Sequence, residues 1–399
     1  MNSAERLGIH SEPRYAGFRV LLRLIYRTVF HSKGTAARFT LKRVLLLIFF
    51  VPFFLAMQAI NRAALLLDDV FFRGYRDVEV KEPVFVVGVH RSGTTYLHHL
   101  LSRDTDNFTT FNLWELFFAP AIIERKFWFA AGAADRALGG FGRRLLFALE
   151  DRALKDLRAI HHTALFEPEE DELVLLPYFA SVFLLLPFPF PEMLWALIRF
   201  DDNVPLREQD RIMARYKACV QRHLYVYGPR RRFISKNPSF SARIEAINRT
   251  FPDAKIVCNV RRPYETLPSL LSLMSFHWKT FDNDPLGLQL RDMILDMANY
   301  FYRHPIDRLP HWPKDRHAFL RYDDLTAHPE RAVLQLYERF GIPFFPAFRA
   351  CLKAQEDAMR SFKSSHRYSL DPWELTREHI RAEYRDVFEY FDFSTDHVA

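Results

Sequence analysis

Hydrophobic and polar positions alternate in blocks along the chain, and the block at residues 84–89 is the most informative. It reads VFVVGV, and such a nearly continuous apolar run is typical of a strand buried on both faces of a parallel sheet. The polar turn HRSGTT follows at once, and an amphipathic helix is predicted from about Thr95. A second unit of this kind is predicted at residues 255–273, where the apolar strand KIVCNV ends at Arg261 and Pro263 occupies the first helical turn. The pattern therefore predicts an α/β fold, in which a parallel sheet is flanked by helices.

The N-terminal part of the chain has a different pattern. Residues 44–60 contain no charged residue, and basic residues precede them at Arg38, Lys42 and Arg43. The run is at the lower limit of length for a bilayer span, and Pro52 lies within it. Three interpretations stay open: a transmembrane span, a helix lying on or partly in the inner leaflet, and a helix buried against the rest of the protein. A span is disfavoured, because the basic flank would keep the N-terminus in the cytoplasm and place the following domain outside.

The turn after the first strand carries the residue types of an anion site. Backbone N–H groups at a helix start lack partners, and small side chains let a phosphate approach them. Those side chains are Ser92, Gly93, Thr94 and Thr95. The spacing of residues 88–95 matches the P-loop, G-x-x-x-x-G-K-[ST], but Thr94 replaces the lysine that bridges the β- and γ-phosphates. The cation is instead Arg91, inside the loop, which favours a ligand without a γ-phosphate. The sheet would then be P-loop-like. A tight turn that binds no ligand is the alternative.

The second turn supplies a candidate partner for this anion site. Arg261 follows the strand at its carboxyl end, where ligands bind in open α/β sheets, and Ser269 lies two turns into the next helix. An arginine and a serine so placed can reach one phosphate. An arginine that only caps the sheet edge is the other interpretation.

Together, the two turns resemble those of the sulfotransferase family. Members carry a loop of the form [KR]-[ST]-G-[TS]-[TS], matched by residues 91–95, and a motif R-x-P-x-x-x-x-x-S, matched by Arg261, Pro263 and Ser269. The strings SKNPS at 235–239, PEEDE at 168–172 and YDDL before Pro329 are similar to those of bacterial members. The resemblance covers residues from about 70 to about 390.

The resemblance implies a donor, a reaction and a set of site residues. The donor would be 3′-phosphoadenylyl sulfate, and its sulfuryl group would pass by in-line displacement to a hydroxyl or amine of an apolar acceptor, with no metal demanded. Arg91 to Thr95 would hold the 5′-phosphosulfate, and Arg261 and Ser269 the 3′-phosphate. Arg367, in the basic segment SSHRYSL, is a further donor-binding candidate. Lys236 would stabilise the departing phosphate; a solvated lysine at a strand end is the alternative.

The general base is open between two carboxylates and a histidine. Glu115 lies in the string WELFF and resembles the catalytic glutamate of Golgi heparan-type members, and its aromatic neighbours predict a raised pKa. The rival is Glu170 or a neighbour in the acidic string EPEEDE. That string has a second interpretation as an ordinary helix start, with proline and carboxylates in the first turn.

Charge and cysteine content limit the partners. The formal net charge of +7 suits an anionic cofactor or an anionic membrane surface. No zinc-finger spacing, RNP string or long basic run indicates nucleic acid. The three cysteines are widely spaced and predict no disulfide framework or metal site, so we expect a cytoplasmic protein, at the inner face of the membrane if residues 44–60 contact lipid. The oligomeric state is not encoded in a readable way.

These features divide the chain into two parts. Residues 1–75 form a basic and hydrophobic helical region, which peripheral membrane contact would explain, and residues 76–399 form the catalytic domain, with an acceptor-binding insertion at about 110–230. Two other functions fit the same loop. A P-loop small-molecule kinase is disfavoured by Thr94, and an inactive nucleotide-binding, membrane-associated protein is disfavoured by the retained cations.

Overall fold

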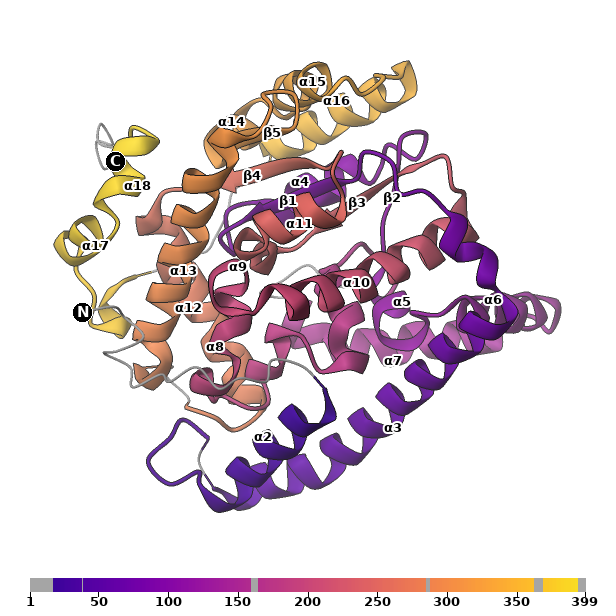
Figure 1. The fold of residues 1–399 in the computed structure, drawn as a ribbon, viewed down its shortest axis with the longest axis horizontal. Coiled ribbons are helices and arrows are strands. Elements are labelled where there is room, and N and C mark those ends of the chain that lie inside the picture. Colours follow the sequence, from indigo (N-terminus) through magenta and orange to yellow (C-terminus); the bar gives the residue numbers. More distant parts are fainter. Residues whose placement is uncertain (1–16, 38, 159–163, 285–287, 362–368, 394–399) are drawn as a thin grey trace.

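The computed structural model describes residues 17–37, 39–158, 164–284, 288–361 and 369–393. Within these ranges five strands form one parallel sheet in the order β2-β3-β1-β4-β5 (Figure 1). The strands are β1 Val84–Gly88, β2 Phe108–Thr109, β3 Arg232–Lys236, β4 Lys255–Val260 and β5 His317–Arg321. The predicted α/β sheet flanked by helices is therefore confirmed.

The strand register aligns the ends from which the candidate site is built. Val86 of β1 pairs with Lys236 of β3, and Gly88 pairs with Asn259 of β4. Because all the strands are parallel, their carboxyl ends meet at one edge of the sheet. The polar turns that follow β1, β3 and β4 are thereby brought together.

Alternate residues of β1 point into two separate hydrophobic cores. Val84 and Val86 pack with α4 Thr94–Leu101, α15 Pro329–Phe340 and α16 Pro346–Ser361. Phe85 and Val87 belong to the larger core, which includes α10 Leu206–Tyr227, α12 Pro263–Thr280 and α13 Leu288–Arg308. Helices thus cover both faces, and the strands are buried on both sides, as a parallel sheet requires.

The other described elements surround this sheet. Before β1 in the sequence they are α2 Phe18–Phe30, α3 Leu41–Phe71 and η1 Arg73–Asp77. Between α4 and β3, in addition to β2 and α10, they are α5 Leu113–Phe118, α6 Ile122–Ala137, α7 Phe141–Arg158, η2 Asp171–Tyr178, η3 Val182–Leu185, α8 Pro191–Ile198 and α9 Phe200–Asn203. After β3 they are η4 Pro238–Ala242, α11 Ile244–Thr250, η5 Leu309–His311, α14 Tyr322–Ala327, η6 Asp371–Trp373, α17 Arg377–Glu383 and α18 Arg385–Tyr390.

Helix α3, which contains the charge-free run 44–60, lies along one edge of the molecule, opposite α15 and α16 (Figure 1). It is long and apolar enough to cross a membrane by length and composition, yet only 17% of its most apolar window is buried. Its inner face is nevertheless fixed by polar contacts: Arg43 donates to the Pro187 carbonyl at 3.0 Å, and Asp68 pairs with Arg222 at 3.0 Å. Helix α3 is therefore packed against the rest of the protein along one face and exposed along the other, which leaves the choice between packing and membrane contact open.

Candidate active site

The loop between β1 and α4 has an unusual backbone. Gly88, Arg91 and Gly93 have φ values of 130°, 72° and 89°, all in the left-handed region. A Cβ on Gly88 would lie 2.2 Å from the carbonyl oxygen of Asn259, and one on Gly93 would lie 2.7 Å from the ring of Tyr322. For a residue with a side chain, as at Arg91, this conformation costs about 1–3 kcal/mol. The loop is therefore held in a compact shape that only glycine allows at two of its positions.

The residues predicted to bind phosphate lie together at the carboxyl edge of the sheet. Arg91 Nε donates to Ser269 Oγ at 3.0 Å, and Arg261 Nη1 donates to the Arg91 carbonyl at 3.2 Å. The Arg261 guanidinium also lies over the Tyr322 ring, 4.2 Å from its centroid. The Tyr302 hydroxyl donates a hydrogen bond to the Arg261 carbonyl at 2.6 Å and so helps to fix the Arg261 backbone. The two motifs, far apart in sequence, thus form one cationic group beside the start of α4.

Carboxylates partly neutralise this group on its outer side. Arg261 pairs with Glu265 at 2.8 Å, one turn further along α12. Arg262 reaches the same carboxylate at 3.2 Å and Asp323 at 3.0 Å. Glu265 and Asp323 are both partly exposed, so solvent screens these pairs. Arg262 is a cation that motif matching did not single out, although it lies next to Arg261 in sequence.

Lys236 and Glu170 meet beside the loop. Lys236 ends β3 and is fully buried, and its Nζ lies 3.0 Å from Glu170 Oε1 and 3.2 Å from Glu169 Oε1. Burial alone would lower the pKa of Lys236, but these two carboxylates raise it above its usual value. The lysine is therefore charged, and the interpretation as a solvated residue is wrong. Glu170 immediately precedes η2, as expected if the acidic string also begins a helix.

The charge of Lys236 acts on three neighbouring histidines. Burial, followed by the charges of Lys236 and Arg91, lowers the pKa of His90 to about 3. Burial and the same lysine charge also lower the pKa values of His98 and His99. These rings are therefore neutral at physiological pH, so they add polarity around Lys236 without adding positive charge.

The structure contradicts the predicted apolar environment of Glu115 and its predicted raised pKa. Its side chain is 1% exposed, forms an ion pair with Arg125 at 2.9 Å and lies 3.3 Å from His223 Nδ1. It also accepts a hydrogen bond from the Asn112 N–H, which closes a capping box at the start of α5. Burial alone would raise the pKa of Glu115, but His223 and Arg125 hold it below the usual value. The carboxylate therefore faces Arg125 of α6 and the His223 ring of α10 rather than its aromatic sequence neighbours, and it lacks the raised pKa expected of a base.

Several polar atoms around the loop are buried without a partner. Among the described residues, no hydrogen bond reaches Ser92 Oγ, His90 Nδ1 or the side-chain amide of Asn259. Asn259 is the neighbour of Gly88 in the sheet, and its Nδ2 lies 3.7 Å from where a Gly93 Cβ would be. Buried polar groups in native structures almost always have partners, so this concentration fits a polar ligand. Sequence reasoning did not single out Asn259, although a polar residue near the carboxyl end of an otherwise apolar strand could have indicated it.

Two further predictions concern ligands of the site. Arg367 lies outside the described residues. No group of three or more His, Cys, Asp or Glu side chains suited to a metal ion occurs within the part of the chain that the structure describes.

Comparison with known proteins identifies the family. The model of the sulfotransferase family matches residues 83–346, and the chain belongs to this family. The omega-hydroxy-beta-dihydromenaquinone-9 sulfotransferases Stf3 of Mycobacterium bovis and Mycobacterium tuberculosis are each 28% identical over 315 residues, which cover 77% of this chain and 74% of theirs.

Solved structures support the same fold. Sulfotransferase STF9 from Mycobacterium avium is 18% identical, with a TM-score of 0.70 over 98% of this chain and 95% of its own. Sulfotransferase STF1 from Mycobacterium tuberculosis is 21% identical, with a TM-score of 0.67 over 92% of each chain. The fold and the family assignment therefore agree.

Proposed function

We propose that this enzyme transfers a sulfuryl group from 3′-phosphoadenylyl sulfate to a hydroxyl group of an apolar, lipid-like acceptor. The observation that carries the proposal is the cluster of Arg91, Arg261 and Ser269 at one edge of the sheet. A nucleotide with phosphates on both its 3′ and 5′ oxygens offers an anion to each of the two motifs. ATP lacks the 3′-phosphate and would leave Arg261 and Ser269 without this anion.

The donor is held at both ends in this arrangement. The N–H groups at the start of α4 and the Arg91 guanidinium bind the 5′-phosphosulfate, because both concentrate positive charge there. Arg261 and Ser269 bind the 3′-phosphate, and the orphaned amide of Asn259 supplies further hydrogen bonds. Arg91 acts as a fixed cation rather than an acid, since its guanidinium does not give up a proton.

The chemical step uses Lys236 and Glu170. Glu170 takes the proton from the acceptor hydroxyl as its oxygen forms a bond to sulfur, and the bond from sulfur to the 5′-phosphate oxygen breaks. Lys236 stabilises the charge that develops on the departing adenosine 3′,5′-bisphosphate. The 3.0 Å contact between Lys236 and Glu170 keeps the acid–base pair next to the donor loop. Glu170 is preferred to Glu115 because Glu115 is enclosed by Arg125 and His223.

An apolar acceptor is supported by a relative and by the position of the helical region 110–230. Stf3 is named for sulfation of a hydroxylated menaquinone, which is a lipid-like molecule. In this chain α6 and α7 expose large apolar side chains such as Phe127, Trp128 and Phe141. Residues 164–169 lead to Glu170 and are tied to α5, since the Leu113 N–H donates to the Glu167 carbonyl at 3.0 Å. An acceptor bound against these helices would reach the proposed base.

We place the enzyme in the cytoplasm. Cys219 and Cys258 are buried and unpaired, and Cys351 is also free, which suits a reducing compartment.

The test is an incubation of the full chain with 3′-phosphoadenylyl sulfate and a panel of acceptors. The panel contains a hydroxylated prenyl quinone, a long-chain alcohol, a simple phenol and a sugar, and mass spectrometry detects the added sulfonate group. We expect sulfonation of the prenyl quinone or the long-chain alcohol, and loss of product in the Glu170→Gln variant. Sulfonation of the sugar alone would contradict the apolar acceptor. Transfer of phosphate from ATP in place of sulfonate would contradict the whole proposal.

A further inference from the structure

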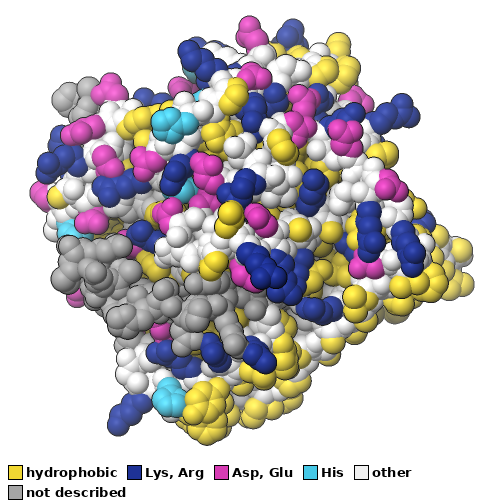
Figure 2. All heavy atoms as spheres, in the orientation of Figure 1, with side chains coloured by type: hydrophobic (Ala, Val, Ile, Leu, Met, Phe, Trp, Pro, Cys, Tyr) yellow, Lys and Arg dark blue, Asp and Glu magenta, His cyan; other side chains and the backbone are white. Residues whose placement is uncertain are grey.

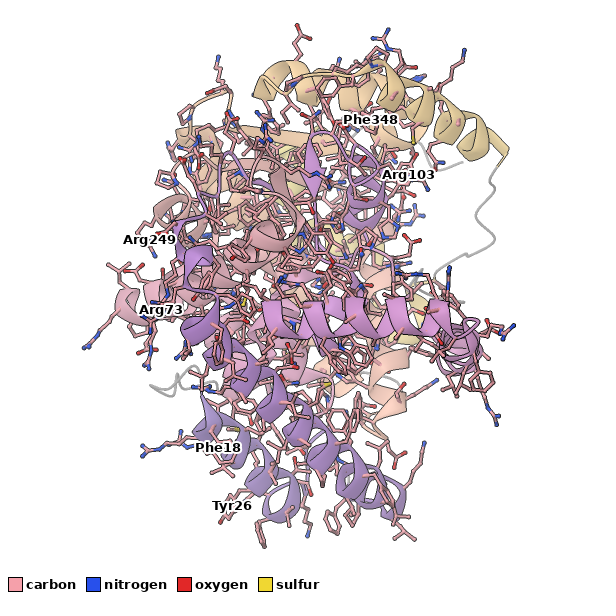
Figure 3. The ribbon with its side chains drawn as sticks, turned by 90° about the vertical axis from the view of Figure 1, so that its right-hand side faces the viewer. Phe18, Tyr26, Arg73, Arg103, Arg249 and Phe348 are labelled. Atoms are coloured by element: carbon pink, nitrogen blue, oxygen red, sulfur yellow. The ribbon has the colours of Figure 1, made fainter. Side chains whose placement is uncertain are left out.

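Helices α2 and α3 expose one continuous apolar surface, which we call the α2–α3 face. It includes Phe18 and Tyr26 of α2 and Leu45, Phe49, Phe53 and Ile60 of α3, each at least 48% exposed. The spacing of four between Leu45, Phe49 and Phe53 puts them on one side of α3. Figure 2 shows hydrophobic side chains gathered along this edge, and Figure 3 places Phe18 and Tyr26 at the end of the molecule opposite Phe348 of α16. Apolar patches of this extent mark an interaction surface in a soluble protein.

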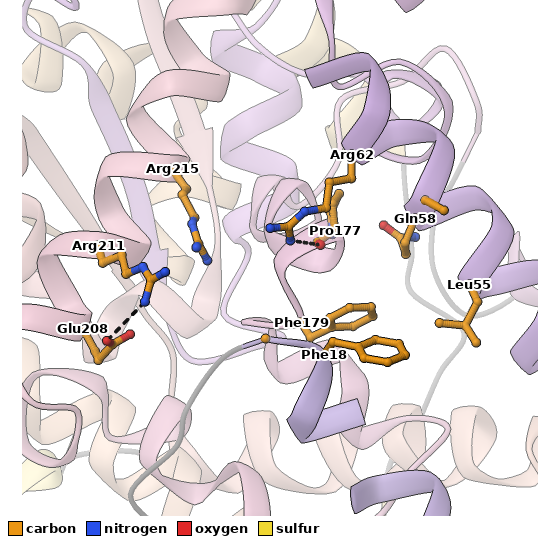
Figure 4. Close-up of a pocket in the computed structure, with 11 residues that line it drawn as sticks. Phe18, Leu55, Gln58, Arg62, Pro177, Phe179, Glu208, Arg211 and Arg215 are labelled. Atoms are coloured by element: carbon orange, nitrogen blue, oxygen red, sulfur yellow. Dashed lines mark hydrogen bonds and ion pairs between the residues drawn. The ribbon is translucent and has the colours of Figure 1, made fainter. Parts of the chain in front are cut away.

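A pocket of about 420 Å³ opens beside the α2–α3 face (Figure 4). Its apolar side is formed by Phe18, Leu55 and Phe179, and its polar side by Arg62, Arg211 and Arg215. None of the residues that line it belongs to the donor site. Phe18 belongs both to the pocket and to the face, so the two are continuous.

The pocket carries more positive than negative charge. Arg211 pairs with Glu208 at 3.6 Å, the one carboxylate in the lining. Arg62 donates to the Pro177 carbonyl at 3.3 Å, and Arg215 lies over the Tyr178 ring at 4.5 Å. Among the described residues no carboxylate lies within ion-pair distance of Arg62 or Arg215. Two guanidinium groups therefore remain available for an anion.

Electrostatics within the pocket agree with this geometry. Burial, followed by the neighbouring charge of Arg211, lowers the pKa of Arg215. A bound anion would reduce the repulsion between these like charges. A planar guanidinium can also donate two parallel hydrogen bonds to a phosphate.

We propose that the α2–α3 face docks on a bilayer and that the pocket receives the phosphate headgroup of an anionic phospholipid. Arg62 and Arg215 hold the phosphate, while Phe18 and Leu55 contact the start of the acyl chains. The chains continue along the exposed side of α3. This site is independent of the proposed donor site and acceptor.

The attachment of α3 determines how it meets the membrane. Arg43, Asn61 and Asp68 on its inner face bind groups of the catalytic domain, including the Phe117 carbonyl, which Asn61 reaches at 2.9 Å. Moving α3 across a bilayer would break these contacts and bury unpaired charges. The helix is about 45 Å long at 1.5 Å per residue, so it lies in the interfacial plane with its apolar side toward the acyl chains.

Charge distinguishes a bilayer from a second copy of the chain. A two-fold contact between two α2–α3 faces would bring their surplus arginines close to one another. An anionic leaflet instead complements them, and each basic residue near such a surface contributes attraction.

Vesicle flotation of the full chain tests the proposal. One set of vesicles contains phosphatidylcholine alone, and the other also contains phosphatidylglycerol. We expect binding to the anionic set, weakened about 10- to 30-fold in the Arg62→Gln/Arg215→Gln variant because two surface charges are lost. The matched control Arg331→Gln/Arg381→Gln removes two exposed arginines of α15 and α17 and should have a clearly smaller effect.

A second variant tests the apolar face. Leu45→Gln/Phe49→Gln changes two exposed side chains, so the fold should persist, as circular dichroism and nucleotide binding would show, while vesicle binding should be lost. Equal binding to both vesicle sets, or equal effects of the two arginine pairs, would overturn the headgroup site. Inorganic phosphate binding without vesicle binding, or a dimer in light scattering that replaces vesicle binding, would overturn the docking.

Discussion

The Arg91 guanidinium donates a hydrogen bond to the Ser269 hydroxyl at 3.0 Å, although the two residues are 178 positions apart in sequence. Arg91 belongs to the loop after β1, and Ser269 to the helix after β4. These strands are neighbours in the sheet, so the contact joins the two motifs that define the proposed donor site. Each motif can therefore be tested by its effect on one nucleotide.

Arg261→Ala should weaken binding of adenosine 3′,5′-bisphosphate. A charge-assisted hydrogen bond contributes about 1.5–3 kcal/mol, which corresponds to about a 10- to 150-fold higher Kd. Calorimetry would measure this Kd and that of adenosine 5′-phosphate, which lacks the 3′-phosphate and should change much less. Arg381→Ala serves as a control on the exposed surface of α17. Equal losses for both nucleotides would rule out the 3′-phosphate role.

Gly93→Ala should abolish nucleotide binding while leaving most of the protein folded. The new Cβ would lie 2.7 Å from the Tyr322 ring, at a φ of 89° that alanine rarely adopts. The loop must then shift, and its N–H groups lose their alignment. Gly139→Ala is the comparison, since it also has a positive φ but nothing within 4 Å of the added atom. Normal nucleotide affinity in Gly93→Ala would show that the loop does not bind the donor.

Lys236→Met should lower both turnover and stability. The substitution leaves Glu169 and Glu170 without their buried cation, and breaking a buried pair costs about 3–5 kcal/mol. Nucleotide affinity should change little, because the two arginines bind the phosphates. Denaturant unfolding and steady-state kinetics would be measured together. Unchanged turnover in the folded variant would mean that Lys236 has only a structural part.

Glu170→Gln and Glu115→Gln should have opposite effects. Glu170→Gln removes the proposed base, so turnover per folded molecule should fall by about 10²- to 10⁴-fold. The loss of stability should be limited, because Glu169 still pairs with the buried Lys236. Glu115→Gln breaks the buried pair with Arg125, so the Tm should fall while the turnover of folded molecules is retained. If Glu115→Gln instead silenced a stable enzyme, the assignment of the base would be reversed.

Asp171 should make stability depend on pH. Burial raises its pKa to about 7, even though Tyr216 and Ser235 donate hydrogen bonds to it. The unfolded carboxyl has a pKa of about 3.9, so between about pH 4 and 7 the folded state binds more protons and stability falls as the pH rises. The slope from this one group is at most about 1.4 kcal/mol per pH unit. Urea unfolding at several pH values should show a shallower slope in Asp171→Asn than in the exposed control Asp106→Asn; identical slopes would contradict the raised pKa.

Local patterns predicted the parts of the fold that local sequence controls. The apolar runs before residues 88 and 261 became β1 and β4, and Pro263 begins α12 as expected. The turn residues Arg91 and Arg261 were found because short motifs carry their own backbone geometry. Their position beside one another follows from strand order, which the resemblance to a family implied and the pattern alone did not.

Contacts between distant segments account for what the sequence did not predict. The aromatic neighbours of Glu115 suggested an apolar site, but Arg125 and His223 approach it from other helices and reverse the expected pKa shift. Lys236 is buried and paired with Glu169 and Glu170, and no residue near it in sequence indicates that these carboxylates contact it. For α3, composition alone could not separate a buried helix from an exposed one, since both are apolar.

The most direct measurement is a calorimetric titration of the full chain with adenosine 3′,5′-bisphosphate, in the absence of magnesium and with ATP in parallel. Binding of the bisphosphate, markedly tighter than that of ATP and weakened by Arg261→Ala, is the predicted result. No heat with the bisphosphate, or tighter and magnesium-dependent binding of ATP, would contradict a donor held between the loop after β1 and the arginine after β4.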